Sequence, residues 1–549
     1  MTKTKLELTW PNKDQFLLVP KDEDGKPVWV SRDHPAAHEV RLTRELASVG
    51  EIGSDPVAGN TVFVGDSLDA MRVLLDVPEF AERYAGQVKL IYADPPFNTG
   101  QAFEHYDDWM EHATWLSFMR DRLMLMRELL APDGSVWIHL DDTEQHRMRL
   151  LMDEVFGAEN FVATIAWQKA DSPRMDAKQF SSSHDYIHVY TRSTGWRPNR
   201  YAQDGGAADD YPYVDEDGRR FRSSPLRKWG KNSARSDRPN LWYPIEGPDG
   251  TSHWPIKPDG TEGNWRWQAS KVKAEADRLQ WIDKGSGFQP YVKEYEDADK
   301  SPVPPQTWWS HDLAGHNRSA KAHGKQLFGR QDAFATPKPE QLLQHIIYIG
   351  TNPGDLVFDP FAGSGTTAAV AHKMGRRYAT VELSPENTDT YVVPRLAKVV
   401  AGADPGGITD DVGWQGGGGF RVVAIEPSIY EVGDDNVVFL REDVSVADLG
   451  RAVAGQLRFT YAPDAAPFCG QRGRMLLAVA PGIVGAEEID DLVARLPEGC
   501  RLTIAAGALI PGAADHLAQT SRGSRAMKIP RDILMRTRRS VAREEEPRA

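Results

Sequence analysis

Cysteine and long apolar runs are the scarcest features of this chain. Its 549 residues include only 2 cysteines, Cys469 and Cys500, which excludes a disulfide framework and a cysteine-rich zinc site. The first residues lack the apolar segment of a signal peptide, and no apolar run reaches the roughly 18 residues that span a membrane. We therefore expect a soluble, cytoplasmic protein with no metal site and no membrane partner.

Positive charge is also scarce, since 65 Lys and Arg face 79 Asp and Glu and give a net charge of −14. This balance excludes a strong, indiscriminate binder of polyanions, although contacts with phosphate groups depend on local charge. Between Arg219 and Arg238, eight basic residues accompany one acid, Asp237. The stretch is either a solvated basic loop or a surface for nucleic acid. Its basic residues are Arg219, Arg220, Arg222, Arg227, Lys228, Lys231, Arg235 and Arg238.

The chain is too long to fold around a single hydrophobic core. Strand-like and helical patterns alternate in two stretches, and the segment between them is irregular and rich in Trp, Gly, Pro and charge. We predict an N-terminal arm (1–55), an α/β core in two halves (56–195 and 334–400), an insert between the halves (196–333), a glycine-rich linker (401–419) and a small C-terminal α/β accessory domain (420–549).

The core reads as a doubly wound α/β fold. Short apolar or β-branched runs predict strands at 61–64, 88–93, 135–140, 356–358 and 377–382. Apolar residues at steps of three and four predict an amphipathic helix over 112–130. Strands that alternate with helices at this spacing form a parallel sheet with helices on its faces.

A glycine turn follows the strand at 356–358. The sequence Asp-Pro-Phe-Ala-Gly-Ser-Gly-Thr-Thr at 359–367 leads from a strand into a helix, which brings the backbone close to a ligand. Glu382 ends the next strand, where a carboxylate can hold both hydroxyls of a ribose. No Gly-Lys-Ser/Thr follows, so an ATP phosphate loop is excluded. The motif therefore favours a nucleoside cofactor, with a dinucleotide fingerprint or a ligand-free turn as the alternatives.

A second strand-end motif, Asp-Pro-Pro-Phe-Asn-Thr-Gly, occupies 94–100 after the strand at 88–93. The two prolines stiffen the loop and remove competing N–H donors. Asp94 and the Pro95 carbonyl can then accept both N–H bonds of an aromatic amine and favour its tetrahedral, more nucleophilic form, while Phe97 stacks on the base. In duplex DNA this amine is buried, so the base has to be flipped out. The alternative is a Pro-Pro turn capped by Asp94.

These motifs resemble the β group of amino-methylating DNA methyltransferases, especially the modification subunits of type III restriction systems and their stand-alone adenine-specific relatives. The matching stretches are 65–68, 89–100, 115–119, 133–142, 336–340 and 359–367. The family places the catalytic motif before the cofactor motif, which is a circularly permuted order on a Rossmann-like sheet, and its target recognition domain coincides with the predicted insert. The resemblance implies transfer of a methyl group from S-adenosylmethionine to the N6 amine of a flipped adenine in site-specific DNA methylation.

The resemblance also assigns roles to individual residues. It makes Asp94, Pro95, Pro96 and Phe97 the catalytic loop, with Phe97 at a position where the family more often has Tyr. The cofactor residues that it implies are Asp66, Lys338, Asp359, Phe361, Gly363, Gly365, Thr366 and Glu382. For Asp66, Thr366 and Thr367, helix capping is the alternative role. His139, Asp141 and Asp142 end another strand near the pocket, where capping and solvation are the favoured roles.

Three alternative functions remain open at this point. A cytosine-N4 methyltransferase would use the same mechanism, because the preference of the first-position Asp for adenine is inherited from the family. A catalytically idle DNA-recognition subunit of a defence complex would keep the fold without needing Asp94, and an NAD-dependent oxidoreductase would leave the 94–97 motif without a role. The expected partner is double-stranded DNA, and a restriction or defence subunit and a second copy of the chain remain open.

Overall fold

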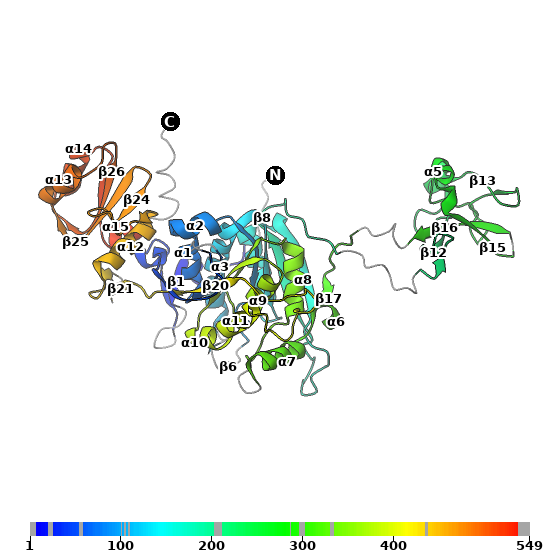
Figure 1. The fold of residues 1–549 in the computed structure, drawn as a ribbon, viewed down its shortest axis with the longest axis horizontal. Helices are drawn as coiled ribbons and strands as arrows, with labels where there is room; N and C mark the ends of the chain where they lie inside the picture. Colours follow the sequence, from blue (N-terminus) through cyan, green and yellow to red (C-terminus); the bar gives the residue numbers. More distant parts are fainter. Residues whose placement is uncertain are drawn as a thin grey trace. The chain divides into compact units, whose positions relative to one another are not determined.

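The computed structural model describes residues 7–19, 26–53, 59–99, 102–103, 106–107, 110–201, 211–285, 287–295, 302–329, 334–433 and 437–535. Gly100 of the predicted catalytic motif lies outside these residues. The chain divides into two compact units, drawn in Figure 1. Unit 1 comprises Met1–Asn199 and Gln306–Ala549, and unit 2 comprises Arg200–Pro305.

A large mixed sheet forms the centre of unit 1, and within the described residues it has ten strands in the order β17-β9-β10-β8-β5-β18-β19-β4-β20-β3. The strands are β3 (Thr43–Gly50), β4 (Asn60–Val64), β5 (Val88–Ala93), β8 (Leu130–Leu140), β9 (Phe161–Gln168), β10 (His184–Thr191), β17 (Trp308–Trp309), β18 (Leu356–Asp359), β19 (Arg377–Glu382) and β20 (Gly419–Ile425). The run from β8 to β20 is parallel, whereas β10 and β3 are antiparallel to their neighbours. The predicted doubly wound α/β fold is therefore confirmed.

Two groups of helices cover this sheet. The first contains α1 (Ser67–Asp76), α2 (Pro78–Tyr84), α3 (His112–Leu129) and α4 (Gln145–Phe156), and the second contains α8 (Glu340–Gly350), α9 (Thr366–Lys373) and α11 (Val393–Val400). Ile91 of β5 packs in one core with Met119 of α3, whereas the adjacent Leu90 packs against Gly350 of α8. Because successive strand side chains point to opposite faces, the two groups lie on opposite faces of the sheet.

The predicted linker at 401–419 is packed into unit 1. Asp404 and Ile408 are buried, and the Trp414 indole Nε1 donates to the Val399 carbonyl at 2.7 Å. The chain then enters β20, which pairs with β4 and, on its other side, with β3 from the predicted N-terminal arm. The glycines of this segment serve tight turns, as Gly416, Gly417 and Gly418 have φ values of 98°, 110° and 72°. The glycine-rich composition suggested a flexible linker, but in the structure these glycines adopt the positive φ values that tight turns need.

The rest of the C-terminal part has a smaller sheet in the order β23-β24-β25-β26-β27, in which β25, β26 and β27 are parallel. Its elements are α12 (Val446–Leu457), β23 (Thr460–Tyr461), β24 (Gly470–Arg472), β25 (Met475–Val484), α13 (Ala486–Ala494), β26 (Arg501–Leu509), α14 (Ala513–Thr520), β27 (Arg525–Lys528) and α15 (Arg531–Leu534). Gln456 accepts from the backbone N–H of Val40 at 2.8 Å, and Arg458 pairs with Asp76 at 2.9 Å. These contacts join it to the rest of unit 1.

Unit 2 is a small fold around a four-stranded antiparallel sheet in the order β11-β12-β16-β15. Its strands are β11 (Tyr213–Val214), β12 (Arg220–Pro225), β13 (Ile245–Glu246), β14 (Ser252–His253), β15 (Leu279–Asp283) and β16 (Phe288–Tyr295), with one helix, α5 (Ala269–Ala274), among the described residues. Trp265 and Trp267 are buried in its core, whereas Trp229 is 73% exposed. The predicted insert reached further, to 333, but residues 306–329 belong to unit 1, where α7 (Asn317–Phe328) and the buried Trp309 lie.

Candidate active site

The carboxyl ends of four neighbouring strands bring together the acidic residues that the sequence singled out. Asp66 follows β4, Asp94 follows β5, Asp359 ends β18 and Glu382 ends β19. In the sheet these strands lie in the order β5-β18-β19-β4 and are parallel, so their carboxyl ends share one edge. This is the edge at which open α/β sheets bind their ligands.

A cavity of about 570 Å³ opens at this edge. The predicted cofactor residues Asp66, Lys338, Asp359, Phe361, Gly363, Thr366 and Glu382 all line it, and so does Pro96 of the catalytic loop. Gly365 is the exception and instead forms the N-cap of α9. The cavity has a size typical of small-molecule and cofactor sites. Sequence reasoning missed several of its other lining residues, namely Phe118, Arg122, Phe334, Thr336, Ser384 and Asn387.

The glycine turn requires two left-handed residues. Gly363 has φ 54° and Gly365 has φ 75°, a region that side-chain-bearing residues rarely occupy. The Gly363 backbone N–H donates to Glu382 Oε2 at 2.9 Å, which fixes the turn against the end of β19. Glu382 Oε1 accepts from the backbone N–H of Ser384 at 3.1 Å. The carboxylate at the end of β19 is therefore held in place by the backbone on both sides.

Asp66 and Thr366 each combine a place in the cavity wall with a structural contact. Asp66 Oδ1 accepts from the Leu68 backbone N–H at 2.7 Å and so caps α1, and Arg122 donates to the same carboxylate at 2.6 and 2.9 Å. The Thr366 hydroxyl accepts from Arg395 at 2.7 Å. The capping alternative thus holds for Asp66, although its side chain also faces the cavity.

Asp359 is a buried carboxyl group with an unusual proton affinity. The pKa of Asp359 is raised from 3.8 to about 7, chiefly by burial and also by the charges of Asp94 and Glu382, against hydrogen bonds from Thr367 and the Phe361 backbone N–H. The Phe361 bond to Oδ1 is 2.9 Å long. A group in this state becomes an anion readily when a positive charge arrives beside it.

Asp94 lies where the cofactor-side cavity meets a second cavity. Its Oδ2 accepts from Lys338 Nζ at 2.5 Å, so Lys338 contacts the catalytic loop as well as the cavity where it was predicted. Its Oδ1 is buried and accepts no hydrogen bond from any described residue. An unsatisfied buried acceptor costs about 1–3 kcal/mol, so this oxygen favours a bound ligand that can donate a hydrogen bond to it.

Three contacts hold the 94–97 loop in shape. The Trp115 indole Nε1 donates to the Pro96 carbonyl at 2.8 Å. Asn98 has a positive φ of 61°, and its side chain accepts from the Met110 backbone N–H at 2.7 Å and donates to the buried Glu144 at 2.8 Å. No strand or helix pattern pointed to Trp115 or Glu144, because these contacts depend on distant segments meeting at the loop.

The Phe97 ring lies close to the side chains of His139 and Lys338. Its centroid is 5.8 Å from that of the His139 imidazole and 5.1 Å from Lys338 Nζ. His139 is buried and bonds to the Tyr92 hydroxyl at 2.8 Å and to Asp185 at 3.3 Å. These two contacts hold the His139 imidazole in place next to the Phe97 ring. Asp142, in contrast, lies on the exposed surface.

The second cavity, of about 830 Å³, shares Asp94, Thr336 and Lys338 with the first. Pro95, Phe97 and Asp141 line it together with much of the loop that joins β9 to β10. Burial would raise the pKa of Asp185 in its wall, but His139 and Lys169 lower it to about 2. The two cavities therefore share Asp94 in their walls, an arrangement that suits a reaction between two bound molecules.

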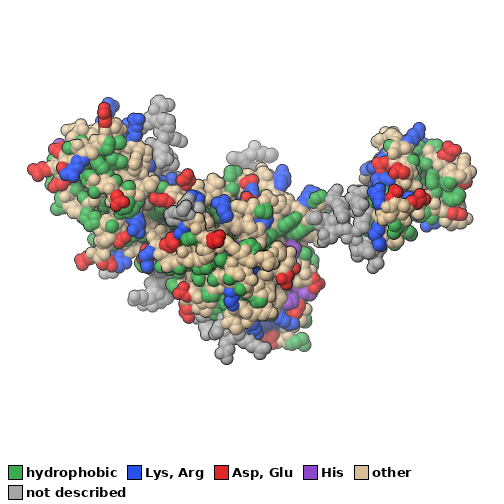
Figure 2. Space-filling model, viewed as in Figure 1, with side chains coloured by type: hydrophobic (Ala, Val, Ile, Leu, Met, Phe, Trp, Pro, Cys, Tyr) green, Lys and Arg blue, Asp and Glu red, His purple; other side chains and the backbone are tan. Residues whose placement is uncertain are grey.

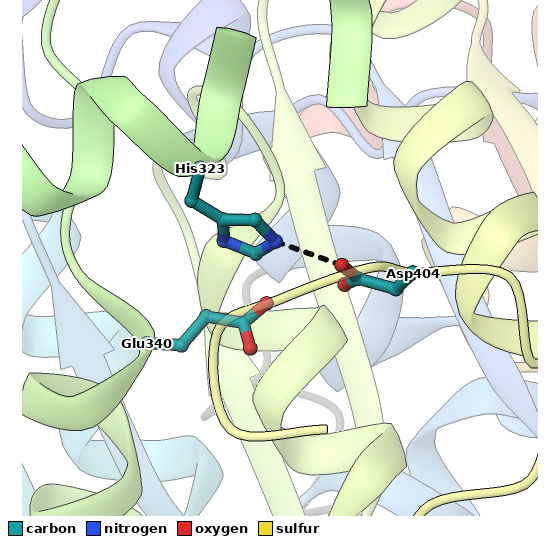
Figure 3. A group of neighbouring side chains, drawn as sticks. All are labelled: His323, Glu340 and Asp404. Atoms are coloured by element: carbon teal, nitrogen blue, oxygen red, sulfur yellow. Dashed lines mark hydrogen bonds and ion pairs between the residues drawn. The ribbon is translucent and has the colours of Figure 1, made fainter. Parts of the chain in front are cut away.

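His323, Glu340 and Asp404 converge close to the cofactor loop and match a metal-binding set in residue type (Figure 3). The His323 Nε2–H donates to the Asp404 carboxylate at 2.7 Å. However, Lys373 Nζ donates to both carboxylates at 2.6 and 2.7 Å, and Arg395 donates to Glu340 at 2.8 Å. The position that a cation would need is already taken by Lys373. The cluster is a buried ion network that ties α8, which follows Lys338, to Thr366 through Arg395.

The eight predicted DNA-binding residues all lie in unit 2, where Figure 2 shows Lys and Arg side chains gathered along one side. Arg219, Arg220, Arg222, Lys231, Arg235 and Arg238 are exposed, and Arg227 and Lys228 are half-buried. Arg222 pairs with Glu294 at 2.8 Å and Arg235 with Glu262 at 2.9 Å. Part of the positive charge is therefore balanced locally by acids that are distant in the sequence.

Among the helices in the described part of the chain, none is long and apolar enough to cross a membrane. The fold is that of a Rossmann-like α/β protein with two adjoining cavities at the carboxyl edge of its central sheet.

Comparisons with known proteins identify the family to which the chain belongs. The profile of the DNA methylase family matches residues 88–392. The chain is 30% identical over 363 residues to the type III restriction-modification enzyme EcoPI Mod subunit of Escherichia phage P1, covering 57% of this chain and 55% of that protein. It is 29% identical over 350 residues to the type II methyltransferase M.KpnI of Klebsiella pneumoniae, covering 60% and 79%. The chain belongs to the DNA methylase family.

The chain spans about half the length of the type III relatives that it matches. Among solved structures, PvuII DNA methyltransferase (cytosine-N4-specific) aligns with a TM-score of 0.34 and 16% identity, covering 62% of this chain and 86% of that one. The M1.HpyAVI–SAM complex aligns with a TM-score of 0.29 and 15% identity, covering 61% and 98%.

Proposed function

We propose that this chain is a site-specific DNA methyltransferase that transfers a methyl group from S-adenosylmethionine to the N6 amine of adenine in duplex DNA. One observation carries the proposal: Asp94 stands between two cavities and offers a buried acceptor oxygen without a donor among the described residues. The exocyclic amine of a flipped base is such a donor. Adenine rather than cytosine is favoured by the Asp in the first position of the loop and by the resemblance to adenine-specific relatives.

The chemistry follows from the position of Asp94. The lone pair of an aromatic amine is delocalised into the ring, so the nitrogen is a weak nucleophile. When its N–H bonds point at Asp94 Oδ1 and the Pro95 carbonyl, the lone pair is directed away from them, toward the cofactor-side cavity. The nitrogen forms a bond to the methyl carbon, the carbon–sulfur bond breaks, and the displaced pair stays on sulfur. Asp94 holds the proton that the amine loses.

Lys338 and Phe97 complete this arrangement. Lys338 pairs with Oδ2 of Asp94, which leaves Oδ1 as the acceptor for the amine. The Phe97 ring is braced by His139 and can stack on the base. Stacking requires only an aromatic face, so Phe in place of Tyr is compatible with activity.

The cofactor-side cavity fits S-adenosylmethionine in its donors and acceptors. When bound, the cofactor supplies an electrophilic methyl group on a positively charged sulfur. Glu382, at the end of β19, would hold the ribose hydroxyls, and the Gly363–Thr366 turn would let the backbone approach the ligand. Asp359 and Asp66 provide negative charge in the same wall. These groups complement a cofactor that carries a sulfonium and an ammonium group.

We propose that modification serves a restriction-modification system, because the EcoPI Mod subunit named above is part of a type III restriction-modification enzyme. Duplex DNA would be held by unit 2 through its exposed Arg and Lys side chains, which position a duplex without reading its sequence. A restriction subunit and a second copy of the chain are the proposed protein partners.

The test is single-molecule sequencing of DNA from a methylation-free host that expresses the protein or its Asp94→Ala variant. We expect N6-methyladenine at one short motif with the native chain and none with the variant. Calorimetric titration with S-adenosylmethionine should show that the variant still binds the cofactor. The surface variant Asp142→Ala, outside both cavities, serves as the control and should methylate normally.

Each other outcome changes a different part of the proposal. Methylcytosine in place of methyladenine would keep the mechanism and replace the base. Full activity of Asp94→Ala would refute the role of the loop. Absence of modification with intact cofactor binding would favour an idle recognition subunit.

A further inference from the structure

The loop between β9 and β10, residues 169–183, has a feature that catalysis at Asp94 does not use. Phe180 is 97% exposed and Met175 is 94% exposed, so two large apolar side chains of one loop stand almost entirely in solvent. Exposed single apolar residues are common on protein surfaces. Phe180 differs because it also lines the 830 Å³ cavity that contains Asp94 and Phe97.

Hydrogen bonds and an ion pair hold the base of this loop, while its apolar side chains Met175 and Phe180 remain exposed to solvent. At its base the Ala170 backbone N–H donates to the Ser183 carbonyl at 3.3 Å, and Arg318 pairs with Asp171 at 2.8 Å. Further along, the Arg174 backbone N–H donates to the Ser181 hydroxyl at 2.7 Å. The segment 175–180 therefore projects from a closed, hydrogen-bonded frame at the rim of the cavity.

The position of the loop fixes what can approach it. Under the proposed function, the target base reaches Asp94 through this cavity, so the duplex from which the base comes has to lie against the cavity rim. Phe180 is on that rim, and Lys178, two residues before it, is exposed. A cation next to an exposed aromatic ring suits a phosphate backbone next to a base stack.

We propose that Phe180 enters the duplex and fills the space that the flipped base vacates. A departing base leaves an unstacked gap, and apolar side chains that insert between base steps stabilise such distorted duplexes. Phe180 is thus a positioning residue: it holds the flipped state open, while Asp94 and Phe97 act on the base itself. The inference rests on the proposed function and adds the device that makes the buried amine accessible.

The experiment compares Phe180→Ala, Phe180→Trp and the control Met175→Ala in the full-length chain. Met175 is nearly as exposed and belongs to the same loop, but it does not line the cavity. Since both side chains are in solvent, these substitutions leave folding intact. Single-turnover methylation is measured with saturating cofactor on two duplexes that contain the native recognition motif, one fully paired and one with a mismatched base opposite the target.

We expect Phe180→Ala to methylate the paired duplex about tenfold to a hundredfold more slowly, the range that base–aromatic stacking spans. A mismatched target flips at lower cost, so most of this loss should be recovered on the mismatched duplex. Phe180→Trp should retain the native rate, and Met175→Ala should stay within roughly twofold of it. With 2-aminopurine as the target base, the fluorescence rise that reports flipping should be reduced in Phe180→Ala.

Other results overturn the inference. A Phe180→Ala rate within roughly twofold of the native rate on paired DNA would exclude the wedge. An equal loss on both duplexes would mean that Phe180 contacts the flipped base or supports the loop. If the native chain itself methylates neither duplex, the proposed function fails, and this result is distinct from a defect confined to the variant.

Discussion

The buried carboxyl group of Asp359 leads to a prediction about the pH dependence of stability. Its pKa is raised from 3.8 to about 7, chiefly by burial and also by the charges of Asp94 and Glu382. Between these two values the folded chain holds a proton that the unfolded chain has released. The unfolded state therefore binds fewer protons than the folded state, and the free energy of unfolding falls as the pH rises.

The size of this effect follows from the two pKa values. The reference is a low pH at which Asp359 is protonated in both the folded and the unfolded state. Relative to it, the carboxyl group lowers the free energy of unfolding by about 2 kcal/mol at pH 5 and by about 4 kcal/mol at pH 8. Asp359→Asn keeps the shape and an acceptor for the Phe361 backbone N–H but removes the ionisation. The variant should therefore gain about 2–3 kcal/mol more stability at pH 8 than at pH 5, relative to the native chain.

Thermal unfolding of the cofactor-free proteins at both pH values is the assay. The melting temperature of Asp359→Asn should exceed that of the native chain by a few degrees more at pH 8 than at pH 5. A gain that does not change with pH would show that Asp359 does not titrate in this range. A loss of stability at pH 8 would mean that the folded state stabilises the carboxylate, which contradicts the burial argument.

Three further substitutions test other parts of the site. Lys373→Met should destabilise the chain by about 3–5 kcal/mol in denaturant unfolding, because two buried carboxylates lose their shared cation, whereas EDTA should leave the stability of the native chain unchanged. Trp115→Phe removes the donor to the Pro96 carbonyl and should slow methyl transfer about tenfold in single-turnover assays, with cofactor affinity by calorimetry unchanged. Gly365→Ala forces a side chain into φ 75° and should lower stability by about 1–2 kcal/mol together with cofactor affinity.

The strand-end residues could be predicted from the sequence because parallel strands leave little choice. Once β4, β5, β18 and β19 are recognised, their carboxyl ends have to meet at one edge, which brings Asp66, Asp94, Asp359 and Glu382 together whatever the loops do. The contacts that complete the site arise differently. Lys338 follows Asp94 by 244 residues in the sequence. Their ion pair therefore depends on how the two halves of the core pack together, which no local pattern reveals.

The remaining differences have a similar cause. The glycines at 401–419 indicated a flexible linker. Composition shows that glycines are present, but it does not show whether they adopt the positive φ values of ordered turns. The structure uses them for turns that bury Asp404 and deliver β20 to the central sheet. Phe180 was overlooked because an aromatic residue in a polar loop has no periodicity, and its significance comes only from the cavity beneath it.

The carboxyl groups of Asp94 and Asp359 both line the cofactor-side cavity and are electrostatically coupled, and this coupling has a consequence for ligand affinity. The charge on Asp94 is one reason why the pKa of Asp359 lies near 7. Asp359 would have a lower pKa with a positive charge bound beside it, so it would release its proton and provide a second anionic contact. The affinity for S-adenosylmethionine should then increase with pH up to about 7, and should do so less for the product, which has lost the sulfonium charge. Isothermal titration of both ligands against pH separates this coupling from a cavity that recognises the ligands by shape alone, for which the two affinities would change in parallel.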